Sequence, residues 1–464
     1  MTTAPNKRDM SESQTPDREP AIASTPQDPV ARYFDFAREG TTWQREIVGG
    51  VTTFLAMAYI MFVNPTILSA AGMDQGALFT ATGLSAIVGT LLMALVARYP
   101  VGIAPSMGLN AFFAYSVVLG MGVSWQTALV GVLFSGLIFV AITALRIREM
   151  VLDAIPLDLK LASACGIGLF IALIGFEDAG IVVDNQATLV MLGNLTAPAT
   201  LLTVVGLIVS VGLMLRRVPG AIFFGMVVTS LLGIAMGVIA MPDAVVSLAP
   251  SVTPVFGTAI SQLFAHPESL FTLNFLVVVL TFLFVEFFDT AGTLMAVANK
   301  AGLMAGNTMR RARPAMLADS SSVVASALIG TSPTTSYIES TAGVASGART
   351  GMASIVTALL FAAALFFSPL LAVVTAHVTA PALIIVGVLM VSSLGEIDWK
   401  RLEIAVPAFL TLIAMPATYS IANGIALGLV MYPITMVVAG RGRELHPVMY
   451  ILFAIFVAYF AFLS

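Results

Sequence analysis

The stretch GIAPSMGLN (102–110) has a counterpart later in the chain, GTSPTTSYIE (330–339). In both stretches a glycine is followed three residues later by a proline, and small or polar residues fill most of the rest. Neither reads as a full apolar span of about 20 residues. An interrupted helix is tolerated within a membrane only where the freed backbone groups are buried in protein or line a wet cavity. We therefore expect two broken segments, at matching positions of two related halves.

The composition excludes a soluble globular protein. Of 464 residues, 58% are hydrophobic and 10% are charged, whereas a soluble domain carries roughly 25% charged residues. The mean hydropathy of +0.98 agrees with a polytopic membrane protein. A net charge of −4 gives no reason to expect a nucleic-acid partner. The single cysteine, Cys165, excludes an intramolecular disulfide, and His266, His377 and His446 have no metal-ligand spacing, so no metal and no cofactor is expected.

The amino-terminal 46 residues are more polar than the rest of the chain. Residues 1–30 are polar and rich in Pro, Ser, Thr and Asp, which predicts a disordered cytoplasmic tail without a cleaved signal peptide. Residues 31–46 are amphipathic, which is typical of a short helix on the membrane surface. A folded-back tether is the alternative for this segment.

The apolar segments predict an all-α polytopic protein with about 14 transmembrane segments. They lie at about 47–70, 77–98, 103–119, 124–145, 160–176, 198–217 and 220–241, and then at about 272–299, 314–330, 334–348, 351–375, 378–394, 403–416 and 419–439. The last two are expected to be separate short helices that turn near residues 416–419. A further stretch, 447–463, is either a fifteenth segment or an interfacial helix.

The basic residues give the orientation. With these segments, all 21 Lys and Arg residues fall in the tail or in every second loop, on one side of the membrane. The other loops carry only acids, among them Asp74, Glu177 and Asp243. The positive-inside rule then predicts a cytoplasmic amino terminus, in a multi-pass protein of the plasma (inner) membrane.

Two inverted repeats follow from the segment count. Seven segments (47–241) precede the outer loop (242–271) and seven follow it (272–439), and residues 440–464 form an apolar carboxyl-terminal segment. Because seven is odd, the second set begins on the opposite side of the membrane. The broken segments are the third of each set, segments 3 and 10. Such pairs are the best sequence indication of a binding site near the bilayer midplane.

Four carboxylates fall within or beside predicted spans: Glu286, Asp289, Asp319 and Glu339. Each costs roughly 2.5–3.5 kcal/mol at a helix centre, so such residues are functional candidates. Glu286 and Asp289 are three residues apart and share a helix face. Burial and like charge favour protonation, as proton-coupled transport requires. Asp319 stands beside three serines and could instead hydrogen-bond a neighbouring helix.

Other candidates surround the first break and the eighth segment. Asn110 presents an amide donor and acceptor together, and Gly108 permits a close backbone approach. Phe112, Phe113, Phe287 and Phe288 flank the polar groups, and an aromatic face beside carboxylates suits a flat heterocycle with N–H donors. Capping or packing is the alternative for Asn110, and core or lipid contact for the phenylalanines.

Several motifs together resemble the nucleobase–ascorbate transporter superfamily, within it the AzgA-like branch of adenine/guanine/hypoxanthine permeases. They are TTFLAMAYIMFVNP (52–65), GLNAFF (108–113), FDTAGTL (288–294), NKAGL (299–303), GTSPTTSYIESTAGV (330–344), RTGMAS (349–354), VPAFLT (406–411) and IANGIALG (421–428). The resemblance covers about residues 31–440.

The resemblance implies a fold with short strands in the broken segments 3 and 10. It implies a core domain of about 47–145 and 272–375, and a gate domain of about 160–241 and 378–439. It also implies proton-coupled purine uptake by an elevator motion, in many members as a homodimer. Carried over, the substrate positions are Asn110, Gly108, Glu286, Asp289 and Glu339. The acids among them are the coupling positions, with Asp289 and Glu339 the firmer pair.

The prediction is therefore a permease that imports hypoxanthine, guanine or adenine with a proton and binds its substrate with those residues and Phe287. Sodium coupling stays open. The nearest alternative is the same fold working on another solute, such as uracil, xanthine or an inorganic anion. An intramembrane enzyme would need a catalytic cluster that the sequence lacks, and a passive channel would not need two titratable groups at a closed site.

Overall fold

The computed structural model describes residues 28–145, 156–270, 272–305 and 308–463. Most of the predicted disordered tail, residues 1–27, lies outside the described residues. The first seven predicted segments contain α3 (Trp43–Met57), α4 (Ile60–Ser69), α5 (Gln75–Leu92), α6 (Met107–Ala111), α7 (Trp125–Ala144), α9 (Leu157–Asp178), α10 (Pro198–Leu215) and α11 (Ala221–Ala235). The next seven contain α13 (Leu273–Lys300), α14 (Ala312–Ile329), α15 (Ser340–Ala345), α16 (Gly351–Ala364), α17 (Ala376–Val391), α18 (Leu402–Ala417) and α19 (Ile421–Val438).

The predicted all-α polytopic class is confirmed by this helix order. Of the described helical segments, eight are long and apolar enough to cross a membrane. The predicted turn near residues 416–419 separates α18 from α19, and Tyr419 in that turn has a φ of 52°. The stretch after it forms α20 (Pro447–Leu463), which packs against α19 and α13.

Local sequence explains where several of the helices begin. Asp74 accepts a hydrogen bond from the backbone N–H of Ala77 at 2.7 Å at the start of α5. Ser124 does the same for Thr127 at the start of α7, at 3.3 Å. Such caps satisfy N–H groups that have no partner inside the helix.

Short strands interrupt the helical order. Strands β1 (Ile103–Pro105) and β6 (Thr334–Ser336) pair with each other, although they are far apart in the sequence. Strands β2 (Val182–Asn185) and β3 (Leu189–Leu192) form an exposed hairpin. The short strands β4 (Met304–Ala305) and β5 (Thr308–Met309) form another hairpin between α13 and α14.

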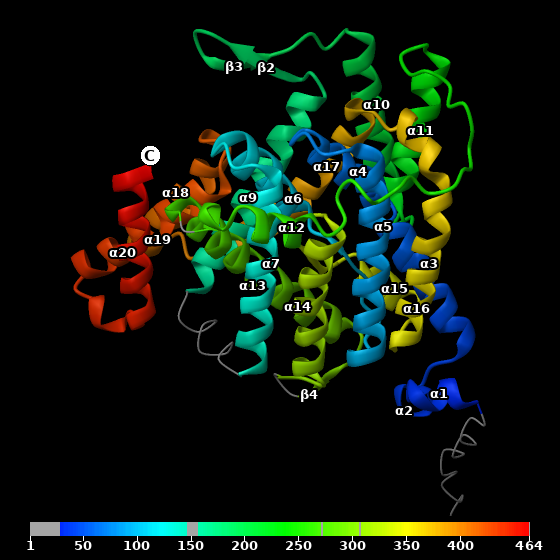
Figure 1. Cartoon of the computed structure of the whole chain (residues 1–464), viewed down its shortest axis with the longest axis horizontal. Helices are drawn as coiled ribbons and strands as arrows, with labels where there is room; N and C mark the ends of the chain where they lie inside the picture. The colour runs from blue at the N-terminus through cyan, green and yellow to red at the C-terminus, as the bar shows by residue number, and fades with distance from the viewer. Residues whose placement is uncertain (1–27, 146–155, 271, 306–307, 464) are drawn as a thin grey trace, which may run out of the picture.

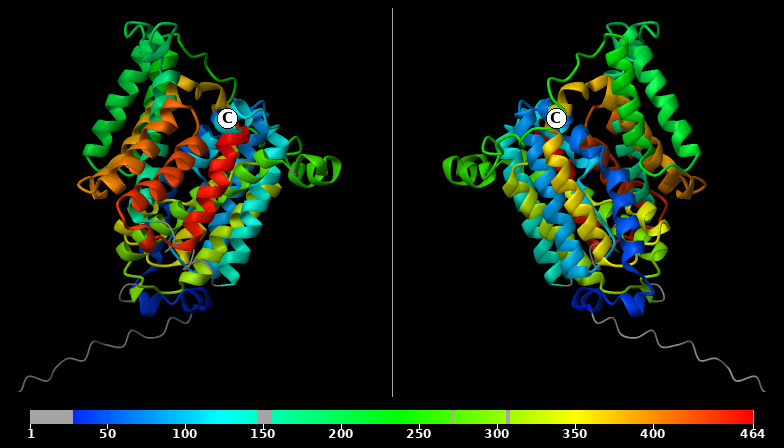
Figure 2. Two further views of the ribbon diagram at one scale, coloured as in Figure 1. Left: turned by 90° about the vertical axis from the view of Figure 1, so that its left-hand side faces the viewer. Right: turned by 90° about the vertical axis from the view of Figure 1, so that its right-hand side faces the viewer.

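The helices pack in two groups. Helices α3 to α7 and α13 to α16 contact one another and form the first packing group. Helices α9 to α11 and α17 to α19 form the second packing group. Figure 2 shows the second group, in green and orange, beside the first, in cyan and yellow-green. The groups meet where α6 and α13 contact α9 and where α4 contacts α17.

Several arginines gather at one end of the molecule. The amino-terminal helices α1 (Pro29–Tyr33) and α2 (Phe36–Glu39) lie at the same end as the β4–β5 hairpin, opposite the β2–β3 hairpin (Figure 1). Arg98, Arg310, Arg311 and Arg349 also lie at that end, beside Glu39 of α2. We call it the basic end.

The amphipathic segment folds back onto the first packing group. Ala31, Phe34 and Phe36 are buried against Met352 and Ile355 of α16. Tyr33 and Trp43 of the same segment are exposed, so the segment has one side against protein and another that is free, and the choice between a surface helix and a tether stays a prediction.

Buried Glu46, in the first turn of α3, holds this region to α16. Its carboxylate accepts hydrogen bonds from the backbone N–H groups of Arg349, Thr350 and Ala353, at 2.9, 3.2 and 3.2 Å. The hydroxyl of Thr41 donates a fourth hydrogen bond at 2.6 Å. A negative charge at the start of α16 is also favoured by the dipole of that helix.

Candidate functional site

The two broken segments meet at their breaks. Strands β1 and β6 run antiparallel, with Ala104 opposite Thr335. The pairing extends at both ends, because Ser106 N donates to Pro333 O at 2.9 Å and Tyr337 N donates to Gly102 O at 3.0 Å. The backbone groups freed by the breaks therefore satisfy each other, as a membrane interior requires. The two breaks predicted from the sequence form one structural unit.

Helix α6 follows β1 and carries two of the predicted site residues. It begins at Met107 and continues as a π-helix over Phe112–Gly120, a distortion frequently found at functional sites. Asn110 is completely buried and its Nδ2 donates to Oδ1 of Asn64 at 3.0 Å. Its own Oδ1 is buried and has no hydrogen-bond partner among the described residues. The side chain thus presents an unused acceptor at the break.

Gly108 allows α6 to approach the second packing group. A Cβ atom at this position would lie 2.7 Å from Cγ2 of Ile167 on α9. That distance is shorter than a van der Waals contact, so a larger residue would push the two helices apart. The structure gives Gly108 a packing role at the contact between the two groups.

Asn64 of α4 connects both breaks. Its Nδ2 donates to Thr82 Oγ1 at 2.7 Å and to Thr331 Oγ1 at 3.0 Å. Its Oδ1 accepts from Asn110, and also from Ser332 Oγ at 3.2 Å. Thr331 and Ser332 precede β6, so one buried amide contacts α5, the first break and the second break.

Glu339 lies three residues beyond β6, immediately before α15, and is half-buried. The hydroxyl of Tyr59 donates a hydrogen bond to its Oε1 at 2.8 Å. Tyr59 is buried in the turn between α3 and α4. The predicted substrate carboxylate therefore lies at the second break, held by a side chain from segment 1.

Asp319 is completely buried and bridges three elements. Its Oδ2 accepts from Thr290 Oγ1 of α13 at 2.6 Å, and its Oδ1 accepts from Ser336 Oγ of β6 at 2.7 Å. Both carboxylate oxygens are thus bound to hydroxyls of neighbouring elements. This arrangement corresponds to the structural alternative that the sequence left open for Asp319.

The eighth segment is a long helix, α13. Glu286 is completely buried on it, so the carboxylate does not face lipid or solvent. The backbones of Phe287 and Asp289 belong to α13, but their side chains lie outside the described residues. Their predicted roles remain predictions.

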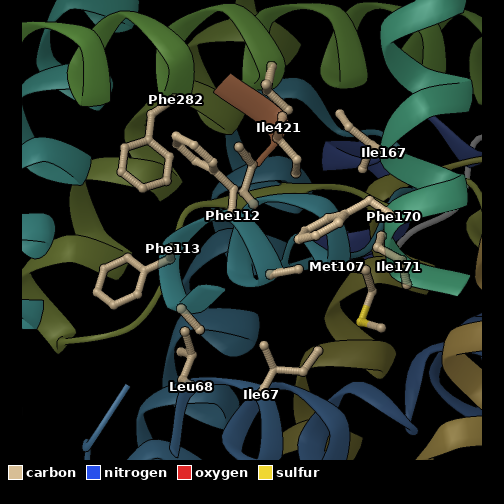
Figure 3. Close-up of a cluster of buried hydrophobic side chains, with 14 of the residues drawn as sticks. Ile67, Leu68, Met107, Phe112, Phe113, Ile167, Phe170, Ile171, Phe282 and Ile421 are labelled. Atoms are coloured by element: carbon tan, nitrogen blue, oxygen red, sulfur yellow. The ribbon is translucent and has the colours of Figure 1, made fainter. Parts of the chain in front are cut away.

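An apolar cluster surrounds α6 (Figure 3). The rings of Phe112 and Phe282 pack edge to face, with centroids 5.0 Å apart. Phe113 also approaches Phe282, at 6.4 Å. Ile167 and Phe170 of α9 contribute from the second packing group. Phe112 and Phe113 are completely buried in this cluster, where the two packing groups meet, which corresponds to the core alternative for these two side chains.

Sequence reasoning missed Asn64 and Tyr59. Both lie in the motif at 52–65, which served only as part of the resemblance. An amide inside an apolar span was the signal that identified Asn110, and the same signal applies to Asn64. No sequence signal identified Tyr59, because its partner Glu339 lies 280 residues away in the sequence.

Comparison with known proteins identifies the family. The profile described as "Permease family" matches residues 44–427. The guanine/hypoxanthine permease PbuG of Bacillus subtilis is 56% identical over 441 residues, which cover 93% of this chain and 99% of PbuG. The adenine permease AdeQ of Escherichia coli is 42% identical over 428 residues, which cover 92% and 95%.

A solved structure shares the fold. The transmembrane domain of a cyanobacterium bicarbonate transporter, BicA, matches with a TM-score of 0.58 at 16% identity, covering 85% of this chain and 97% of that domain. The fold is thus that of transporters with core and gate domains, as the resemblance implied. Taken together, the helix order, the paired breaks and these relatives show that the chain belongs to this permease family, in the nucleobase–ascorbate transporter superfamily, and is a multi-pass membrane permease rather than an enzyme.

Proposed function

We propose that this protein imports purine nucleobases (hypoxanthine, guanine and adenine) together with a proton, across the plasma membrane and with its amino terminus in the cytoplasm. The observation that carries the proposal is the 56% identity with a guanine/hypoxanthine permease over almost the whole of both chains. AdeQ, named an adenine permease, extends the range to a base with an exocyclic amine.

The chemistry around the breaks fits such a substrate. A purine base offers ring N–H donors and a flat apolar face. In this proposal Glu339 accepts hydrogen bonds from ring N–H groups, and the unused Oδ1 of Asn110 accepts another. A buried acceptor without a partner costs about 1–3 kcal/mol, which a bound donor would recover. Phe112 belongs to an aromatic cluster that suits the ring face.

Proton coupling follows from the cost of an ionised carboxylate within a membrane. A proton that neutralises Glu339 or Glu286 lowers the cost of moving the loaded site through the apolar interior. We assign the same role to Asp289, and place Phe287 and Gly108 beside the substrate. The coupling ion is a proton rather than sodium in this proposal, because burial of a carboxylate favours its protonated form.

The movement would be of the elevator type. We assign the first packing group to the core domain (about 47–145 and 272–375) and the second to the gate domain (about 160–241 and 378–439). Their contact around α6 includes apolar side chains such as Ile167 and Phe170, beside two hydrogen bonds that join Ser116 to the backbone of Tyr419 and Ile421. Apolar surfaces can slide without leaving hydrogen-bonding groups unsatisfied. Pairing of two gate domains in a homodimer would hold the gate still while the core moves.

The experiment is uptake of labelled hypoxanthine into proteoliposomes that contain the purified protein. An acid-outside gradient should stimulate uptake and drive accumulation against a concentration gradient, while a sodium gradient should not. Glu339→Gln should abolish uptake, yet leave the melting temperature of the protein close to that of the parent. Glu268→Gln, which changes an exposed outer-loop carboxylate, should transport normally.

A competition panel separates the alternatives. Guanine and adenine should compete with hypoxanthine, whereas uracil and bicarbonate should not. The basic residues of the long helices lie at the helix ends, as Lys160 and Lys300 do, which disfavours an anion as substrate. Undiminished uptake by Glu339→Gln, or competition by bicarbonate alone, would contradict the proposal.

A further inference from the structure

A pocket opens at the basic end, between the amino-terminal helices and the first packing group. It is partly open to solvent. Its lining comes from four separate parts of the chain and includes four arginines. The lining residues are Phe34, Glu39, Arg98, Tyr99, Leu303, Arg310, Arg311 and Arg349.

The pocket carries an excess of positive charge. Asp35, beside the pocket, contacts Arg311 at 2.7 Å and Arg98 at 3.4 Å. Glu39 forms an ion pair with Arg310. These four guanidinium groups and two carboxylates have an excess of two positive charges, and Arg349 also donates to the backbone oxygens of Val344 and Ala348. Each guanidinium has five N–H donors, so donors remain after these ion pairs have formed.

Tyr99 adds a buried donor to the same pocket. The side chain is 1% exposed, and its hydroxyl has no hydrogen-bond partner among the described residues. Burial raises the pKa of Tyr99 to about 12, although the nearby Arg310 and Arg311 act in the opposite direction. The hydroxyl is therefore protonated at neutral pH and able to donate. Buried polar groups are normally satisfied, and a ligand in the pocket would satisfy this one.

We propose that this pocket binds the phosphate group of an anionic ligand. Arginine side chains match the geometry of phosphate oxygens through paired N–H donors, and an anionic phosphate, whether a diester monoanion or a dianion, would offset one or both of the two excess charges. The pocket lies at the end of the membrane helices, so the phosphate can come from a lipid headgroup or from a soluble phosphate compound. A bound phosphate would connect α2, the residues after α5, the segment between β5 and α14, and the residues before α16.

The test uses the purified full chain in uncharged detergent micelles. Its melting temperature is measured against rising inorganic phosphate at constant ionic strength, and separately against rising phosphatidylglycerol in the micelles. Phosphatidylcholine, which has a phosphate but no net charge, is the lipid control. At least one of the two anionic probes should raise the melting temperature in a saturable way, and the probe that does so identifies the source of the phosphate.

Variants of pocket residues test whether the stabilisation by phosphate arises from binding in the pocket. The double variant Arg310→Gln/Arg311→Gln should weaken binding by about tenfold or more, because charged hydrogen bonds are lost. The matched control is Arg216→Gln/Arg217→Gln, which changes two exposed arginines after α10 that do not line the pocket. This control should bind as the parent does.

Tyr99→Phe keeps every ion pair and tests the pocket even if the double variant folds poorly. It should weaken binding by about threefold to tenfold. The proposal is wrong if neither anionic probe gives saturable stabilisation, or if phosphatidylcholine is as effective as phosphatidylglycerol. It is also wrong if the control pair weakens binding as much as the pocket pair, or if Tyr99→Phe binds like the parent.

Discussion

The side-chain amide of Asn110 donates a hydrogen bond to Oδ1 of Asn64 at 3.0 Å, and this contact joins the helix of the first break to α4. Through its other hydrogen bonds Asn64 also holds Thr331 and Ser332, ahead of the second break. One buried side chain is therefore hydrogen-bonded to residues of both breaks.

Asn64→Ala should destabilise the protein strongly. It leaves buried groups on Thr82, Thr331, Ser332 and Asn110 without their partner, and each such loss costs about 1–3 kcal/mol. We expect a clear fall in the melting temperature and loss of hypoxanthine uptake. Asn194→Ala, in an exposed outer loop, should change neither quantity much. A parent-like melting temperature for Asn64→Ala would show that the breaks do not depend on this amide.

Asp319→Asn should affect stability rather than coupling. The carboxylate accepts from Thr290 and Ser336, and an amide offers a donor where one of these hydroxyls now donates. We expect destabilisation of about 1–3 kcal/mol, with the proton dependence of the remaining uptake unchanged. Glu339→Gln should instead lose uptake while it keeps the stability of the parent. Loss of proton dependence in Asp319→Asn would place this residue in the coupling mechanism.

Tyr59→Phe should weaken substrate binding without disturbing the fold. The hydroxyl of Tyr59 holds Oε1 of Glu339 at 2.8 Å, so its removal frees the carboxylate to take other orientations. We expect KM for hypoxanthine to rise by about tenfold, the effect of one hydrogen bond to a charged group, and kcat to change less. Tyr450→Phe removes a hydroxyl that bonds the backbone of Gly442 and should leave both constants unchanged. Equal kinetics for the parent and Tyr59→Phe would remove Tyr59 from substrate binding.

A disulfide between the two packing groups should stop transport. Ser116 Oγ lies 3.4 Å from the backbone N of Ile421, which places the two backbones close enough for a disulfide. In a Cys165→Ala background, the pair Ser116→Cys/Ile421→Cys should lose uptake on oxidation and recover it on reduction.

The control for this disulfide lies within the second packing group. Thr203 Oγ1 bonds the backbone O of His377 at 2.9 Å, and the pair Thr203→Cys/His377→Cys should transport whether oxidised or reduced. Full uptake by the oxidised Ser116–Ile421 pair would argue against relative movement of the two groups.

The turn between α19 and α20 should open in acid. A hydrogen bond from the side chain of Arg441 is the main cause that holds the pKa of Glu444 below its usual value of 4.5. This contact stabilises the folded turn at pH values above the unfolded pKa, and the contribution is lost as the pH falls through the lower, folded pKa. Amide hydrogen exchange at 441–446, corrected for intrinsic rates, should therefore speed up below about pH 4. Glu444→Gln should exchange faster at neutral pH and show no such transition; a transition that survived this substitution would have another origin.

The sequence by itself determined the membrane class, the helix order, the alternation of charge and the two breaks. These features depend on local composition and spacing: proline and glycine interrupt a helix wherever they occur, and about 20 apolar residues span a bilayer in any context. The positions of Glu339 and Asn110 at the breaks were predictable for the same reason, because a polar residue within an apolar span can be recognised from the sequence alone.

Only the tertiary structure decided what these groups contact. The sequence left open whether Asp319 is a functional residue or hydrogen-bonds a neighbouring helix, and in the structure Thr290 and Ser336 bind both of its oxygens. No sequence pattern identified Tyr59, because its role depends on a partner from the opposite half of the chain. The hydrogen bonds of buried polar groups are set by which helices pack together, and that packing brings together residues hundreds of positions apart, beyond the reach of any local pattern.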